Sequence, residues 1–327
     1  MKKLLAVLMM LATTASAQEG PVYGARLEGF DYPHPVELFR FTSQKMAMEM
    51  AYMDVRPASA NGRTVVLLHG KNFCAGTWEG TITALTGAGY RVIAPDQVGF
   101  CKSTKPAHYQ YSFEQLSANT RALLTSLGLT RITIMGHSMG GMLATRFALA
   151  HPDITEQLVS VNPLGLEDAR AKGIPAGSVD DSYRGALNTS AASIKSYQQS
   201  VYYAGSWKPE YDRWVEMQAG IYRGPGKEIM AWNSALTSEM IATQPVVHEL
   251  ERLAMPVLLL IGDRDTTGRS NRAPPGVVTG DFPAMSEAAA KRIPRAKLVR
   301  FAEMGHSPQI QDPARFHAAL LDGLKIN

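Results

Sequence analysis

The chain carries a series of short apolar runs, each followed by a turn and then by a stretch of helical character. Such runs occupy Thr64–Leu68, Arg91–Ala94, Ile132–Met135 and Gln157–Val161. Continuous apolar runs are typical of strands buried on both faces, and their alternation with helices is typical of parallel sheets. We therefore predict an α/β fold, in which a mostly parallel central sheet is flanked by helices and connected by right-handed crossovers.

This alternation is interrupted once. Residues 164–251 contain no apparent sheet strand and are expected to form several helices and loops, broken by prolines. Apolar runs return at Pro256–Ile261 and Leu298–Phe301. We interpret 164–251 as a helical cap inserted after the strand that follows the elbow helix described below. The core domain is then expected to comprise residues 18–163 and 252–327.

The first 17 residues are predicted to form a secretory signal peptide. Lys2 and Lys3 precede the apolar run Leu4–Ala12, and Ala15-Ser16-Ala17 provides a small-x-small cleavage site. The run is too short to span a bilayer as a helix. We expect an exported protein, periplasmic or secreted, without a membrane span.

Composition excludes several classes of function. The chain has 327 residues, of which 45% are hydrophobic and 19% charged, with a formal net charge of +4. This is a globular composition, and no basic block indicates a nucleic-acid partner. No cluster has the spacing of a metal site, and no glycine-rich dinucleotide motif follows a strand. We expect neither metal nor cofactor, and the sequence does not indicate an oligomeric state.

The most informative stretch is Gly136-His137-Ser138-Met139-Gly140, which lies between a predicted strand and a predicted helix. In this context Gly-x-Ser-x-Gly is the pattern of a nucleophile elbow, a tight turn that exposes a serine hydroxyl above the sheet. A serine is a poor nucleophile until a base takes its proton, and the base is usually a histidine oriented by a carboxylate. Catalytic groups on parallel sheets gather at the carboxyl ends of strands. We therefore expect the histidine and the carboxylate that activate Ser138 just after other predicted strands.

Two carboxylates, Asp263 and Asp265, follow one late strand, and His306 follows the next. The order Ser, Asp, His and the motifs at the strand ends resemble the α/β-hydrolase family with a cap domain. The resemblance covers about Val36 to Leu324. It is carried by five motifs: His69-Gly70, Asp96-x-x-Gly99, Gly136-His137-Ser138-Met139-Gly140, Gly262-x-x-Asp265 and Gly305-His306.

The resemblance implies a role for each residue. Ser138 is expected to be the nucleophile, and His306 the general base and later the general acid. Asp265 matches the family position that orients the histidine, with Asp263 as the alternative. The backbone N–H groups of Met139 and Lys71 are expected to form the oxyanion hole.

The activity implied is hydrolysis of a carboxylic ester through an acyl-enzyme, on a small-molecule substrate with an apolar moiety. Ser138 occupies the position where the family's epoxide hydrolases and haloalkane dehalogenases have aspartate. Amides or peptides, lactones and carbon–carbon bonds remain alternatives, since fold and triad do not choose among them. A peptidase that recognises a free amino terminus would need cap carboxylates facing its pocket. A non-catalytic binding protein with the same fold is the alternative of a different class.

The sequence departs from the family in the loop after Asp96. Val98 stands where the family has arginine, and Cys101 where it has glycine. In this fold the loop lies beside the one that carries Cys74. Cys74 and Cys101 are therefore either disulfide-bonded at the rim of the site or two buried thiols.

Aromatic residues recur in the predicted cap at near-helical spacing. They are Tyr203, Trp207, Tyr211 and Trp214. This spacing fits a face that packs the cap, and it also fits an apolar lining for the substrate.

Overall fold

The computed structural model describes residues 20–175 and 177–325. The predicted signal peptide, residues 1–17, lies outside the described residues and remains a prediction. Within the described ranges, no helix combines the length and the apolar character that crossing a membrane requires.

The core is one eight-stranded sheet with the strand order β1-β2-β4-β3-β5-β6-β7-β8. The first two strands form an antiparallel pair that joins β4 in antiparallel fashion, and all other neighbours are parallel. This confirms the prediction of a mostly parallel sheet. The strands are β1 (Glu37–Ser43), β2 (Met46–Val55), β3 (Thr64–Leu68), β4 (Arg91–Pro95), β5 (Ile132–His137), β6 (Thr155–Val161), β7 (Val257–Gly262) and β8 (Ala296–Phe301).

Helices cover both faces of this sheet, as its apolar strands require. Successive strand residues point to opposite faces, so Val65 and Leu67 pack with the helices on one face of the sheet, whereas Val66 and Leu68 pack with those on the other. The core helices are α1 (Glu79–Gly87), α2 (Phe113–Ser126), α3 (Met139–Ala150), α8 (Phe282–Arg292), α9 (Pro308–Gln311) and α10 (Pro313–Gly323), with a 3₁₀ turn at Ala75–Trp78.

Local sequence signals fix several helix starts. The Ser112 hydroxyl accepts from the amide of Gln115 at 3.0 Å, and the Asp312 carboxylate accepts from the amide of Arg315 at 3.2 Å. Each side chain satisfies one of the amides that a helix start leaves unpaired.

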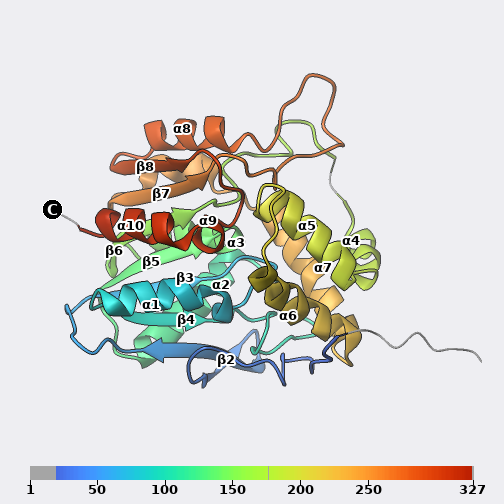
Figure 1. Ribbon diagram of the computed structural model, residues 1–327, viewed down its shortest axis with the longest axis horizontal. Coiled ribbons are helices and arrows are strands. Elements are labelled where there is room, and N and C mark those ends of the chain that lie inside the picture. The colour runs from blue at the N-terminus through green and yellow to red at the C-terminus, as the bar shows by residue number, and fades with distance from the viewer. Residues whose placement is uncertain (1–19, 176, 326–327) are drawn as a thin grey trace, which may run out of the picture.

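Between β6 and β7 the chain forms helices and no strand in its described part. These helices gather beside the sheet in Figure 1, in yellow and light orange. They are α4 (Val179–Leu187), α5 (Ala191–Tyr197), a π-helix (Gln198–Tyr202), a 3₁₀ turn (Pro209–Tyr211), α6 (Asp212–Arg223), α7 (Lys227–Thr243) and a 3₁₀ helix (Val247–Arg252). We refer to this helical segment as the cap.

Candidate active site

Ser138 lies in a strained turn between β5 and α3. Its backbone has φ 58° and ψ −122°, a conformation that non-glycine residues rarely adopt. The turn is possible because Gly136 and Gly140 approach their surroundings closely. A Cβ on Gly136 would overlap the carbonyl of Gly140, and a Cβ on Gly140 would overlap the carbonyl of Leu68. The fold thus places Ser138 at the carboxyl edge of the sheet, with the start of α3 directly behind it.

His306 and Asp265 are brought together from the loops after β8 and β7. The Nδ1 of His306 lies 2.5 Å from Oδ2 of Asp265, and both side chains are fully buried. The carboxylate also accepts from the amide of Thr267 at 2.8 Å and from Nδ2 of Asn162 at 2.8 Å. These donors stabilise a buried carboxylate. The Asp265 side chain is thereby fixed as the partner of His306.

The alternative carboxylate, Asp263, has a different partner. Its two oxygens accept from Nε and Nη2 of Arg300 at 2.8 and 2.9 Å. This bidentate ion pair directs Asp263 to β8, while Asp265 pairs with His306.

His137, inside the elbow, holds the backbone of the His306 loop. Its Nε2 lies 2.8 Å from the carbonyl oxygen of His306, to which the N–H donates, and the two rings are 4.7 Å apart between centroids. Burial, with His306 nearby, holds the pKa of His137 well below its usual range, so the ring is neutral. The Nε2 of His306 is itself buried and has no hydrogen-bond partner within the described ranges. That nitrogen is left to accept a proton.

The loop after β3 approaches the elbow closely. A Cβ on Gly70 would lie 3.0 Å from Cβ of Ser138, so only glycine leaves room there. His69 fixes this loop: its Nδ1 donates to the Gly70 carbonyl at 2.8 Å, and its Nε2 accepts from the amide of Gln97 at 3.0 Å. The backbone next to Ser138 on this side therefore belongs to Gly70, which Lys71 follows in the chain.

Cys74 and Cys101 form a disulfide, with their Cα atoms 5.8 Å apart. The bond joins the loop after β3 to the loop after β4. The buried carboxylate of Asp96 lies between the same loops and accepts from the amides of Ala75 at 2.7 Å and Lys102 at 3.0 Å. A covalent link and a buried carboxylate therefore hold the rim of the site, where the sequence departs from the family pattern.

The cap closes over His306 through its π-helix. The ring of Tyr202 packs on the imidazole, with centroids 5.0 Å apart, and its hydroxyl accepts from Nδ2 of Asn72 at 2.9 Å. The backbone carbonyls of Val201 and Tyr202 accept from the amides of His306 and Ser307, each at 3.2 Å. Ser138 is only 4% exposed. The cap therefore shields the site from solvent.

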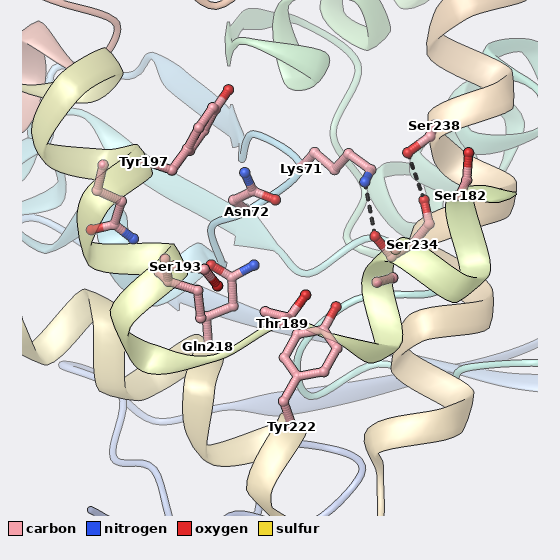
Figure 2. Close-up of a pocket in the computed structure, with 14 residues that line it drawn as sticks. Lys71, Asn72, Ser182, Thr189, Ser193, Tyr197, Gln218, Tyr222, Ser234 and Ser238 are labelled. Carbon is pink, nitrogen blue, oxygen red and sulfur yellow. Dashed lines mark hydrogen bonds between the residues drawn. The ribbon is translucent and has the colours of Figure 1, made fainter. Parts of the chain in front are cut away.

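A cavity of about 380 Å³ lies between the cap and the loop after β3. Lys71 and Asn72 lie on one side, and the remaining lining residues come from the cap (Figure 2). Most of the lining side chains are hydroxyls and amides. Tyr202 contacts both Asn72 in this wall and the imidazole of His306, so a single side chain links this wall of the cavity to His306.

The cap aromatics singled out in the sequence pack against one another. Tyr203 stacks on Tyr211 at 3.8 Å between centroids, Trp207 meets both rings edge-on, and Arg213 lies over Trp214. None of the four singled-out aromatics lines the cavity. Of the two interpretations, the structure favours packing.

Three further residues act around the site. Asn162 holds Asp265, His137 holds the His306 loop, and Tyr202 covers the imidazole. Asn162 directly follows a predicted strand and His137 lies within the elbow motif, so the sequence places both residues near the site. No sequence pattern indicates Tyr202, because its contact with His306 depends on how the cap folds back over the sheet.

A family model described as the alpha/beta hydrolase fold matches residues 63–313. The chain therefore belongs to the alpha/beta hydrolase fold family, as the sequence motifs and the sheet order suggested. Its relatives include proteins named as a candidate carbamate hydrolase, an epoxide hydrolase and a haloalkane dehalogenase, and they support a hydrolase.

Individual relatives give a range of activities. A crystal structure from Pseudomonas aeruginosa PAO1, named as a probable hydrolytic enzyme, is 62% identical, with a TM-score of 0.92 over 94% of this chain and 99% of that one. RutD of Pantoea ananatis, named as a candidate carbamate hydrolase, is 23% identical over 84% of this chain and 93% of its own. Epoxide hydrolase B of Mycobacterium tuberculosis is 30% identical over 55% of this chain and 48% of its own.

Proposed function

We propose that the protein is a serine hydrolase that cleaves a carboxylic ester through an acyl-enzyme. The observation that carries this proposal is the buried hydrogen bond between Asp265 and His306, at the same edge of the sheet as a serine in an elbow turn. A carboxylate on Nδ1 keeps the proton there and leaves Nε2 free to act as a base. The unpartnered Nε2 of His306 fits that role.

In the first step, Ser138 Oγ attacks the ester carbonyl and its proton moves to Nε2 of His306. The tetrahedral intermediate collapses when His306 returns the proton to the leaving alcohol. Water, activated by the same nitrogen, then attacks the acyl-enzyme and releases the acid. Asp265 stabilises the imidazolium in both steps without itself becoming protonated.

The oxyanion of each intermediate would be held by the N–H groups of Met139 and Lys71. The close approach of Gly70 to Ser138 supports the position of Lys71, and the helix start at Met139 supports the other donor. Donors fixed in this way stabilise charge that develops only in the transition state.

Other bonds can be cleaved by the same groups. RutD supports a carbamate as a second substrate, and lactones, amides and carbon–carbon bonds also present a carbonyl to Ser138. Epoxide opening is disfavoured, because Ser138 replaces the aspartate that the family uses for that chemistry. We place the ester first, because its alkoxide is a better leaving group than the nitrogen of an amide or the carbon of a carbon–carbon bond.

A peptidase that recognises a free amino terminus finds no support in the cavity. Its lining includes no Asp or Glu and one lysine, so an ammonium group would be repelled there. The cap glutamates Glu167, Glu216 and Glu239 form ion pairs with Lys172, Arg223 and Arg170, and none of them lines the cavity.

Labelling with a fluorophosphonate probe tests the proposal. We expect the probe to modify Ser138 in the folded wild-type protein, and His306→Ala to slow the modification by orders of magnitude. Ser59→Ala, in an exposed turn, is the matched control and should label as wild type does. Folded wild-type protein that takes no label would favour a non-catalytic binding protein.

We further propose that the mature protein is exported after cleavage behind Ala17. The charge and apolar pattern of residues 1–17 supports this proposal. The disulfide supports it too, because disulfides form and persist in oxidising compartments outside the cytosol. N-terminal sequencing of the processed protein should begin at Gln18. A mature protein that retains Lys2 and Lys3 would contradict export.

A further inference from the structure

The cavity beneath the cap is a built pocket with one charge in it. Fourteen residues line it, contributed by the loop after β3 and by the helices of the cap. Lys71 is the only charged residue among them, and the rest are largely serine, threonine, asparagine, glutamine and tyrosine. The volume of about 380 Å³ falls at the small end of the range for ligand pockets.

The ammonium group of Lys71 is inside the pocket and lacks a counter-charge. Its Nζ donates to Oγ of Ser234 on α7 at 2.9 Å, as Figure 2 shows. No carboxylate of the described residues lies within ion-pair distance of it. A partly buried cation that is paired only with a hydroxyl is costly unless a ligand completes its shell. Burial accordingly lowers the pKa of Lys71 to about 8.

Gln198 supplies a second, independent observation. It is the first residue of the π-helix, lines the same cavity, and is 1% exposed. Neither Nε2 nor Oε1 of its amide has a hydrogen-bond partner in the described part of the chain. Buried amides are normally satisfied, so an unpaired amide beside the pocket marks a place for a polar ligand.

We propose that this cavity binds a carboxylate carried by the substrate, through the ammonium of Lys71 and the amide N–H of Gln198. The inference rests on the proposed ester hydrolysis and names its substrate class: an ester with a free carboxylate a few bonds from the scissile carbonyl. Lys71 would act twice. Its backbone N–H is the proposed donor to the oxyanion, and its side chain lines the cavity.

A matched pair of esters tests this substrate class. The probes are mono-4-nitrophenyl glutarate and 4-nitrophenyl methyl glutarate, which differ in one negative charge. We expect wild type to prefer the anionic ester in kcat/KM, and Lys71→Met to lower that preference by about tenfold to a hundredfold, the range of a charge-assisted hydrogen bond. Lys71→Arg should keep most of the preference, because the charge remains. Lys195→Met, an exposed lysine on α5, is the control and should leave it unchanged.

Calorimetric titration with glutarate separates this inference from the proposed function. We expect Ser138→Ala to bind glutarate as wild type does, and Lys71→Met and Gln198→Leu to bind it at least about tenfold more weakly. If the protein binds glutarate in a manner that depends on Lys71 but hydrolyses neither ester, the carboxylate site is supported and the proposed esterase activity is wrong. Ester hydrolysis with equal preference in wild type and Lys71→Met, or glutarate binding unaffected by Lys71→Met, would overturn the inference.

Discussion

At the carboxyl edge of the sheet the buried carboxylate of Asp265 is held by three hydrogen bonds, whereas in the cavity under the cap the buried amide of Gln198 is left unpaired within the described ranges. Asp265 accepts from His306, Asn162 and Thr267. Gln198, only a short distance along the cap from the Tyr202 ring on His306, has no partner among the described residues. A satisfied network is rigid and keeps one geometry, and an unsatisfied one gains from a ligand. We therefore assign the bond-breaking steps to the side chains at the core edge, and the selection of the substrate to the cavity under the cap.

The largest effect is expected from the core edge. Asp265→Asn keeps the shape of the side chain but removes the charge that fixes the tautomer of His306, and should lower kcat by roughly 10⁴-fold. Steady-state kinetics with an activated ester measures it. Asp263→Asn is the matched control, since its carboxylate pairs with Arg300 and not with His306.

Unchanged kcat in Asp265→Asn would place the orienting acid elsewhere. A loss in Asp263→Asn as large as that in Asp265→Asn would show that the contrast between the two carboxylates is wrong.

The fold and the core edge of the site could be anticipated because their signals are local. A continuous apolar run predicts a buried strand, and Ser138, Asp265 and His306 each lie just after such a run in a recognisable motif. The expected donors of the oxyanion hole followed from the same motifs. The positions of these residues depend only on the sheet, and the pattern of apolar runs along the chain predicts that sheet.

The cap could be predicted as helical but not in its contacts. The π-helix over Gln198–Tyr202 has no sequence signature, and it is what places Tyr202 on His306 and Gln198 at the cavity. The direction of the Lys71 side chain depends on where α7 lies. The aromatic spacing around Tyr211 suited two interpretations, because packing and ligand lining use the same residues.

The next effect concerns how firmly the core edge is held. Cys74→Ala together with Cys101→Ala opens a loop of 27 residues and should lower the free energy of unfolding by about 3.5 kcal/mol in the chain-entropy model. Urea unfolding of the double variant against wild type measures the loss. Wild type with added reductant should reach the same stability as the double variant. Equal stability of oxidised wild type and double variant would show that the disulfide does not stiffen this rim.

On the cap side, the charge on Lys71 should set a pH dependence. Burial lowers its pKa to about 8, so the cation is present below that pH and is lost above it. The preference for the anionic over the neutral glutarate ester should fall by roughly tenfold between about pH 7 and pH 9. The other titratable lining groups are Tyr197, whose pKa burial raises to about 12, and Tyr222, whose pKa burial also raises.

Taking the ratio of the two esters cancels any pH dependence of the catalytic steps, because the same catalytic groups act on both substrates. Lys71→Arg keeps its charge throughout and should give a flat ratio. A wild-type ratio that is also flat to about pH 9 would remove Lys71 from substrate selection.

The smallest effect is expected where the two regions meet, at Tyr202. Tyr202→Phe keeps the ring on His306 and deletes the hydroxyl that accepts from Nδ2 of Asn72. A neutral hydrogen bond contributes about 1 kcal/mol, so kcat/KM should fall about fivefold. If the cap only selects substrate, KM carries this change and kcat stays constant. Asn72→Ala, which removes the other partner, should behave in the same way, and the double variant should be no worse than either single variant. A fall in kcat with unchanged KM would instead show that Tyr202 contributes to the catalytic step, and the assignment of catalysis to the core edge alone would be wrong.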